Sequence, residues 1–276
     1  MKKSVLFTFA ILLLSLASAV QGAEIKWAGC GVSKKAFMKE LAASYEKKTG
    51  TKVSLKGSGA TKGIRLVAAG EFDIGGSCRH KLDVLAEKEA MLHHVAWDAL
   101  VIIVKKDNPV DSMTTEQVKA VFKGTIKNWK ELGGPAAPVK LLVRKGKTSG
   151  AGLMLREILF NNPDEDYSPD AELKKSSGPI EAGVSKDINA IGVTGVSSAK
   201  KRKKVKMLKV DGVAPSKEAV MSGKYPFVRP LYIVTRGEPT GEIKKFIDFA
   251  KSPEGQAIIS SQGTVNLEEG KSLKVR

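Results

Sequence analysis

Two short glycine-rich segments carry the chemistry that can be inferred most directly from this sequence. They are Gly57-Ser58-Gly59-Ala60-Thr61 and Thr148-Ser149-Gly150-Ala151-Gly152. Glycine lets the backbone approach a ligand closely, and a helix that begins at such a turn points unpaired N–H groups and the positive end of its dipole at an anion. Arg144 and Lys145 stand just upstream of the second segment. The segments predict an oxyanion site, the alternative being tight turns that only cap helices. Neither has the spacing of a nucleotide-binding loop.

Asp73 is a candidate for discriminating between anions. It follows Phe72 in a short predicted strand and precedes Ile74-Gly75-Gly76-Ser77. An aspartate in that place commonly acts as a cap or an ion-pair partner. If it faces an anion pocket instead, it would accept a hydrogen bond from a protonated anion and repel a fully ionised one. Such a pocket would favour hydrogen phosphate over sulfate-like anions.

The two cysteines are expected to lie close together. Cys30 ends the first predicted strand and Cys78 follows the third, so a parallel sheet would place both at the same edge. In an oxidising compartment this arrangement predicts a disulfide. The alternative is a redox or metal role with His80, but the spacing matches no zinc pattern. No catalytic arrangement of side chains stands out, so we predict no catalytic residue, no metal and no cofactor.

The elements that must position these residues alternate between strands and helices, which indicates α/β layers around mostly parallel sheets. Short apolar strands are predicted over residues 24–28, 52–56, 72–75, 98–105, 139–143, 190–193 and 230–235. Helices are predicted from Ser33 to Gly50, from the two glycine-rich segments to Ala69 and Leu159, and over residues 115–122, 240–250 and 253–262.

Composition limits the class of protein. With 276 residues, 42% hydrophobic and 27% charged, the chain fits neither disorder nor a membrane-embedded bundle. A formal net charge of +17 favours an anionic partner, and an aromatic content of only 6% argues against a platform for stacking nucleic-acid bases. The basic run at residues 200–206 lacks interleaved aromatics, so we interpret it as a solvated loop and expect no nucleic-acid partner.

The N-terminus predicts export. Met1-Lys2-Lys3 is positively charged and residues 5–16 are apolar, and both Ala17-Ser18-Ala19 and Val20-Gln21-Gly22 offer small-residue cleavage patterns. Residues 1–23 are therefore interpreted as a signal peptide, and the protein is expected in the periplasm. The apolar run is too short to span a bilayer. Trp27-Ala28-Gly29-Cys30 half resembles a lipoprotein signal, but charged residues separate it from the apolar run.

Eight segments, in order and over nearly the whole chain, resemble the periplasmic phosphate-binding proteins of ABC transporters, the PstS-like substrate-binding proteins. They are GSGATKGI at 57–64, FDIG at 72–75, SCR at 77–79, VFKGTIKNW at 121–129, SG at 149–150, AIGV at 190–193, YPFVRPLY at 225–232 and SPEGQ at 252–256. The resemblance implies a two-lobed α/β fold of the type II periplasmic-binding-protein class, with two mixed sheets flanked by helices and joined by two hinge strands.

The resemblance also implies where the lobes and the ligand lie. The hinge strands would cross near residues 100–104 and 231–235, so lobe 1 would hold residues 24–101 and 233–276, and lobe 2 residues 102–232. The ligand would be gripped in the cleft between the lobes, which close around it. The family's pocket falls on Cys30, Gly31, Val32, Ala60, Thr61, Asp73, Ser77 and Arg79 of lobe 1, and on Arg144, Lys145, Ser149, Gly150 and Ala151 of lobe 2.

This chain departs from the family's pocket in its side-chain donors. The family usually has hydroxyl residues at the positions of Cys30 and Gly31, serine at that of Ala60 and threonine at that of Ala151. Backbone N–H donors survive such changes, but side-chain donors do not. Each lost charge-assisted hydrogen bond costs roughly 1.5 to 3 kcal/mol. The nearby hydroxyls that could substitute are Thr61, Thr148 and Ser33.

The resemblance implies an extracytoplasmic solute-binding protein that captures phosphate or a related oxyanion and delivers it to an ABC transporter permease in the inner membrane. We expect a monomer that is not an enzyme. Two alternatives stay open from the sequence: a phosphatase on the same scaffold, and a secreted protein for anion sensing or adhesion.

Overall fold

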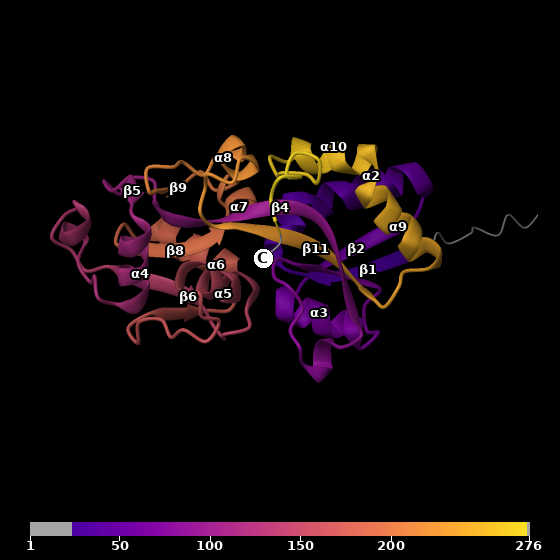
Figure 1. The fold of residues 1–276 in the computed structure, drawn as a ribbon, viewed down its shortest axis with the longest axis horizontal. Coiled ribbons are helices and arrows are strands. Elements are labelled where there is room, and N and C mark those ends of the chain that lie inside the picture. Colours follow the sequence, from indigo (N-terminus) through magenta and orange to yellow (C-terminus); the bar gives the residue numbers. More distant parts are fainter. Residues whose placement is uncertain (1–23, 275–276) are drawn as a thin grey trace, which may run out of the picture.

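The computed structural model describes residues 24–274, so the predicted signal peptide at 1–23 lies outside the described residues. Within them the chain forms a mixed sheet of nine strands in the order β2-β1-β3-β11-β4-β8-β6-β7, with β9 also paired to β4. Strands β4 and β11 run along the molecule between its two lobes, as Figure 1 shows. The predicted two-lobed α/β fold is confirmed.

Lobe 1 contains most of the N-terminal and C-terminal parts of the chain. Its strands are β1 (Glu24–Gly29), β2 (Lys52–Gly57) and β3 (Ile74–Ser77), all parallel, and β3 then pairs antiparallel with β11 (Val228–Arg236). Its helices are α1 (Gly31–Ser33), α2 (Lys39–Thr49), α3 (Ala60–Ala68), α9 (Gly241–Lys251) and α10 (Pro253–Ser261), with a π-helical turn at Lys34–Met38 and a 3₁₀ turn at Leu85–Glu87.

Lobe 2 contains the middle of the chain. Its strands are β5 (Ser112–Met113), β6 (Lys140–Arg144), β7 (Glu172–Lys174), β8 (Ala190–Gly195), β9 (Val205–Met207) and β10 (Lys209–Val210). Its helices are α4 (Thr115–Lys123), α5 (Gly150–Leu155), α6 (Ser177–Lys186), α7 (Val196–Ala199) and α8 (Lys217–Met221), with a 3₁₀ turn at Trp129–Leu132 and a π-helical turn at Arg156–Phe160. Strands β6, β7 and β8 are parallel to one another.

Strand β4 (Ala90–Lys105) belongs to both lobes. It spans 16 residues, beginning eight residues before the predicted start at Asp98. Its residues up to Ala99 pair antiparallel with β11, and from Leu100 onward it pairs with β8. Residues 95–104 are all buried, because helices and loops cover both faces of the sheet at this point. One continuous strand therefore connects the two halves of the sheet.

Local sequence signals explain several helix ends. A capping box begins α4, with the Thr114 side chain accepting from the Gln117 N–H and Gln117 reaching back to the N-cap. Helix α2 ends at Gly50, which has a φ of 77°, as the sequence predicts. The first helix begins at Gly31, two residues before the predicted start at Ser33, and the Cys30 sulfur caps it by accepting from the Ser33 N–H.

The hydrophobic core is divided between the lobes. Trp27 lies fully buried in the core of lobe 1, and Trp129 lies fully buried in that of lobe 2. Among the described helices, none combines the length and the apolar character needed to cross a membrane.

Candidate functional site

A cavity of about 260 Å³, called here the inner pocket, lies between the two lobes. The first residues of helices α1, α3, α5 and α6 line it, as do loop residues that precede three of these helices. From lobe 1 it is lined by Cys30, Gly31, Val32, Gly57, Ser58, Gly59, Ala60 and Cys78. From lobe 2 it is lined by Arg144, Gly150, Ala151, Lys175, Ser176 and Ser177.

The helix starts give the inner pocket a positive electrostatic character. The first N–H groups of a helix have no partner within it, and the helix dipole adds a partial positive charge at that end. Helix α1 continues through the π-helical turn into α2, and α5 continues into residues 156–160, so each forms a longer helical rod than its label suggests. The guanidinium of Arg144 adds a full charge, and its Nη1 donates to the Lys174 carbonyl at 3.0 Å. Burial lowers the pKa of this arginine.

A second cavity of about 580 Å³, the outer pocket, adjoins the inner one. The two share Ser58, Gly59, Ala60 and Arg144 as lining residues. The outer pocket is also lined by Thr61, Lys62, Arg65, Leu66, Ala69, Glu71, Ala86, Lys145, Thr148 and Ser149.

The structure brings ten of the thirteen predicted ligand-binding residues to these two pockets. The inner pocket contains Cys30, Gly31, Val32, Ala60, Arg144, Gly150 and Ala151, and the outer pocket contains Thr61, Lys145 and Ser149. Asp73, Ser77 and Arg79 line neither. All three have partners within the protein that account for their positions.

Asp73 lies at the wrong end of its strand for contact with an anion. Strand β3 begins at Ile74, two residues later than predicted, so Asp73 precedes the strand instead of following its buried part. Its Oδ2 accepts a hydrogen bond of 2.7 Å from the Lys26 N–H, and its own N–H donates to the Lys26 carbonyl. Because the inner pocket lies at the carboxyl ends of β1 and β3, Asp73 is a strand-edge cap and not a pocket residue.

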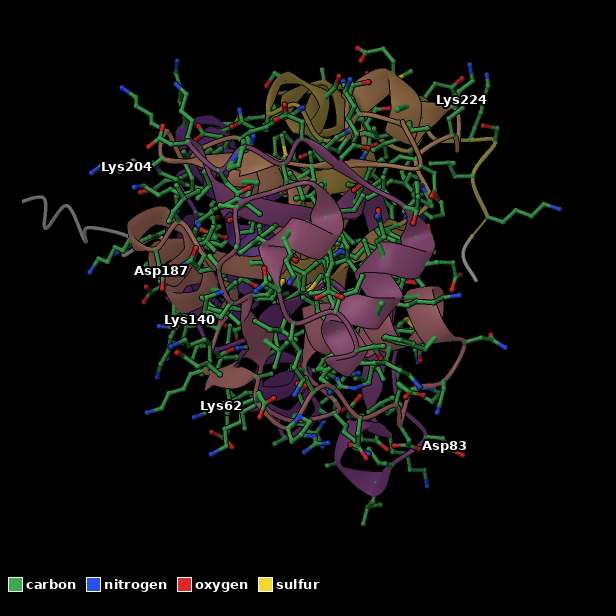
Figure 2. All side chains as sticks on the ribbon, turned by 90° about the vertical axis from the view of Figure 1, so that its left-hand side faces the viewer. Lys62, Asp83, Lys140, Asp187, Lys204 and Lys224 are labelled. Atoms are coloured by element: carbon green, nitrogen blue, oxygen red, sulfur yellow. The ribbon has the colours of Figure 1, made fainter. Side chains whose placement is uncertain are left out.

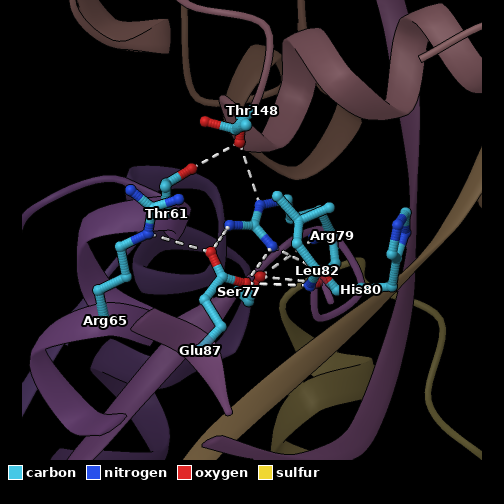
Figure 3. A network of polar contacts seen from close by, with 8 residues as sticks. All are labelled: Thr61, Arg65, Ser77, Arg79, His80, Leu82, Glu87 and Thr148. Atoms are coloured by element: carbon cyan, nitrogen blue, oxygen red, sulfur yellow. Dashed lines mark hydrogen bonds and ion pairs between the residues drawn. The ribbon is translucent and has the colours of Figure 1, made fainter. Parts of the chain in front are cut away.

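Ser77 and Arg79 are used in a buried network, shown in Figure 3. The Ser77 hydroxyl donates to the Arg79 carbonyl at 2.7 Å and accepts from the Arg79 N–H at 3.1 Å. The Arg79 guanidinium forms a two-pronged ion pair with Glu87, at 2.9 and 2.6 Å, with both side chains fully buried. Arg79 is therefore neutralised within lobe 1 and is not available to an anion.

The same network connects the lobes. The carbonyl of Thr148 in lobe 2 accepts from Arg79 Nε at 3.1 Å and from Thr61 Oγ1 at 2.5 Å, as Figure 3 shows. Burial is the largest influence on Glu87 and would raise its pKa, but hydrogen bonds from Arg79 and the Leu82 N–H outweigh it and lower the pKa. The carboxylate thus stays ionised and holds Arg79 in place against the partner lobe.

The predicted disulfide is absent: both cysteines are free and buried. The Cys30 sulfur is directed toward Ser33, whose N–H and hydroxyl lie at 3.2 and 2.9 Å. It therefore caps the first helix and is not bonded to Cys78. The Cys78 sulfur lies against the start of α5, because a Cβ added to Gly150 would come within 2.6 Å of it.

The two thiols differ in their protonation. Burial and the neighbouring Cys78 raise the pKa of Cys30 well above its ordinary value. For Cys78, a hydrogen bond from Cys30 lowers the pKa to about 6 against the opposing effect of burial, and the charge of Arg229 acts in the same direction. Cys78 is therefore the more acidic of the two thiols and the acceptor in the pair, and Cys30 is the donor.

A buried ion pair joins the hinge strands beneath the pocket. Arg229 of β11 donates from Nη2 to Asp98 Oδ2 of β4 at 3.0 Å, with both side chains fully buried. Asp98 Oδ1 also accepts from the N–H and hydroxyl of Ser197 in lobe 2. Among the residues that the structure describes, the Nε and Nη1 atoms of Arg229 have no hydrogen-bond partner. This pair was not predicted, because the pattern of a single strand does not show which buried charges face each other.

The pocket residues of α6 were also missed. The predicted site did not include Lys175, Ser176 and Ser177, yet α6 begins at Ser177 and points into the inner pocket. The sequence does contain a pattern that could have indicated this part of the pocket, because small hydroxyl residues are followed by glycine and a helix, as in the two glycine-rich segments. Among residues 24–274, no group of three or more potential metal ligands is clustered.

Comparisons with known proteins agree with this geometry. The chain matches the PBP superfamily domain over residues 17–254. It is 28% identical to the phosphate-binding protein PstS of Borreliella burgdorferi, over 84% of this chain and 86% of that protein. It is 29% identical to PstS of Bacillus subtilis, over 79% of this chain and 72% of that protein.

Solved structures extend the likeness to the fold. A putative phosphate ABC transporter substrate-binding protein from Clostridium perfringens, solved with bound phosphate, superposes with a TM-score of 0.79 at 29% identity, covering 88% of this chain and 99% of that one. An ABC-type phosphate transport receptor from Vibrio cholerae superposes with a TM-score of 0.68 at 26% identity, covering 88% of this chain and 100% of that one. With its two lobes, its hinge strands and a pocket formed by helix starts from both sides, the chain belongs to the PBP superfamily, and the resemblance to PstS-like proteins is confirmed.

Proposed function

We propose that this protein captures phosphate or a related oxyanion between its lobes and delivers it to the permease of an ABC transporter. The observation that supports this most is the convergence of the starts of α1 and α3 from lobe 1 and of α5 and α6 from lobe 2 on one pocket that also contains Arg144. An anion there would be held by backbone N–H groups from both lobes, so that binding and closure are coupled.

The proposed ligand set follows from the pocket lining. We assign the anion to the N–H groups near Gly31, Ala60, Gly150 and Ser177 and to the guanidinium of Arg144. Hydroxyl donors are few, since the Ser58 hydroxyl already donates to the Gly59 carbonyl at 3.2 Å. Main-chain donors carry most of the recognition, which compensates in part for the hydroxyls that the family usually has.

Discrimination between anions is assigned to Cys78. We propose that Cys78, the more acidic thiol of the pair, is ionised at neutral pH and takes the role predicted for Asp73, because it is buried and lines the inner pocket. A protonated phosphate can donate a hydrogen bond to it, whereas sulfate has no proton to donate at neutral pH and is repelled. We therefore expect phosphate and arsenate to bind more tightly than sulfate.

The remaining assignments complete the proposal. The lobe boundaries are placed at residues 101/102 and 232/233, supported by the change of β4 from β11 to β8 at Leu100 and by the pairing of β11 with β3 from Tyr232. We propose that the protein is exported by its N-terminal signal peptide, acts in the periplasm as a monomer, and has no enzymatic activity.

Calorimetry on the purified mature chain tests the function. Phosphate and arsenate should bind with one site per chain, and sulfate more weakly. Replacing Arg144 by Met should weaken phosphate binding by at least about tenfold, because a charge-assisted hydrogen bond is lost in a partly buried site. Absence of heat with each of the three anions would refute the proposal. Steady hydrolysis of p-nitrophenyl phosphate by the pure protein would instead support the phosphatase alternative.

A further inference from the structure

The outer pocket is larger than the site that a single small oxyanion needs. At about 580 Å³ it is more than twice the volume of the inner pocket, and it lies within the range of roughly 300–1,000 Å³ typical of sites for organic ligands. The two pockets meet at Ser58, Gly59, Ala60 and Arg144, so a ligand seated in the inner pocket has a continuous path into the outer one.

The outer pocket has an excess of positive charge. Four basic residues and one acidic residue line it: Lys62, Arg65, Arg144, Lys145 and Glu71. The side chains of Lys62 and Lys145 are exposed and form no ion pair or hydrogen bond with the described residues, and Figure 2 shows Lys62 at the edge of the molecule. Arg65 shares Glu87 with Arg79, at 3.2 Å from Nε. Two ammonium groups are therefore available to a ligand, one from each lobe.

The walls of the outer pocket come from both lobes. Thr61 of lobe 1 and Thr148 of lobe 2 are joined by a hydrogen bond of 2.5 Å, and both line the pocket. Leu66, Ala69 and Ala86 contribute a non-polar part of the lining. A ligand that fills the outer pocket would contact both lobes there, and would thus favour the closed form in addition to the anion in the inner pocket.

We propose that the preferred ligand is a small phosphoryl compound with a second anionic group, of which a diphosphate is the simplest example. The phosphoryl group occupies the inner pocket. The second group lies in the outer pocket against Lys62 and Lys145, with Arg144 between the two groups. This inference rests on the proposed function, since it requires the inner pocket to bind a phosphoryl group.

Calorimetry with inorganic pyrophosphate, inorganic phosphate and glycerol phosphate tests the inference. Pyrophosphate should bind at least about tenfold more tightly than phosphate, which corresponds to one added charge-assisted hydrogen bond. Glycerol phosphate carries a neutral tail, so its affinity should exceed that of phosphate by much less. If the outer pocket accommodated a second group without recognising its charge, glycerol phosphate and pyrophosphate would exceed the affinity of phosphate by the same factor. That result would overturn the inference.

Matched variants locate the effect. The double variant Lys62→Met, Lys145→Met should bind pyrophosphate no more tightly than phosphate. The control is Lys47→Met, Lys224→Met, which removes the same charge from exposed lysines that line neither pocket. It should keep the preference for pyrophosphate. Equal losses in the pocket and control variants would mean that only net charge matters, which would overturn the inference.

The outcomes separate this inference from the proposed function. If phosphate binds and pyrophosphate gains nothing, the inner-pocket proposal survives and the second anionic group is rejected. If none of the three ligands binds, both proposals are rejected. Binding of pyrophosphate without measurable binding of phosphate would reject inorganic phosphate as the ligand and support the second anionic group as a required contact.

Discussion

Replacing Gly150 by Ala should weaken anion binding without unfolding either lobe. A Cβ at this position would come within 2.6 Å of Cys78 Sγ and 2.9 Å of the Ala60 Cβ, and both atoms belong to the opposite lobe. Distances below 3.0 Å require something to shift, and separation of the lobes gives the simplest relief. Overpacking of this kind costs roughly 1–3 kcal/mol. If the cost falls on the closed state, affinity drops by roughly 5- to 150-fold, at about 1.4 kcal/mol for each factor of ten.

The assay is phosphate titration by calorimetry, with small-angle scattering to follow closure. Gly178→Ala is the matched control, because Gly178 also lies in the first turn of a helix at the inner pocket but lines neither pocket, and a Cβ there comes no closer than 3.9 Å to the Ser176 Oγ. The control should bind phosphate almost as the natural chain does. In the absence of ligand, Gly150→Ala should unfold near the natural temperature, and phosphate should raise that temperature less. Unchanged affinity and unchanged compaction in Gly150→Ala would refute the closed arrangement of the lobes.

Three further predictions follow from the buried charges. Iodoacetamide should alkylate Cys78 through the inner pocket, and the rate should rise with pH around a pKa of about 6. Bound phosphate should slow this reaction at pH 7. A rate that rises only near pH 9 would contradict an ionised Cys78 at neutral pH. Glu87→Gln should lower the free energy of unfolding by about 3–5 kcal/mol in urea, because it leaves buried Arg79 unpaired; a change below about 1 kcal/mol would contradict this. Burial lowers the pKa of His93 and His94, so the unfolded state binds more protons than the folded state. The free energy of unfolding should therefore fall as the pH drops below about 6.5, which urea titrations at pH 7.5 and 5.5 can measure. Replacing both histidines by Gln should reduce the difference in free energy between the two pH values.

The sequence predicted the fold well where local patterns and family segments agreed. The end of α2 at Gly50 and the two strand–turn–helix units match the structure, since each depends on neighbouring residues. The start of β4 was placed late because His93 and His94 interrupt the apolar run; both lie within the strand, with their ring nitrogens bonded to Thr235 and to the Ala96 carbonyl.

The sequence predicted which backbone segments form the candidate site, but not which charged side chains face it. Gly31, Ala60 and Gly150 are the first residues of helices and line the inner pocket. This placement could be predicted because each helix directly follows a strand and a turn. Whether a charged side chain faces the pocket depends on one-residue shifts in a strand and on partners far away in sequence. Asp73 was misplaced by such a shift, and Arg79 was misassigned because Glu87 neutralises it.

The central claim is that backbone N–H groups from both lobes hold the anion, and a phosphate titration followed by amide NMR shifts tests it most directly. The account predicts that the largest changes fall together at the starts of α1 and α3 in lobe 1 and of α5 and α6 in lobe 2, with one common dissociation constant. Changes confined to one lobe, or to the basic stretch at residues 200–206, would contradict it.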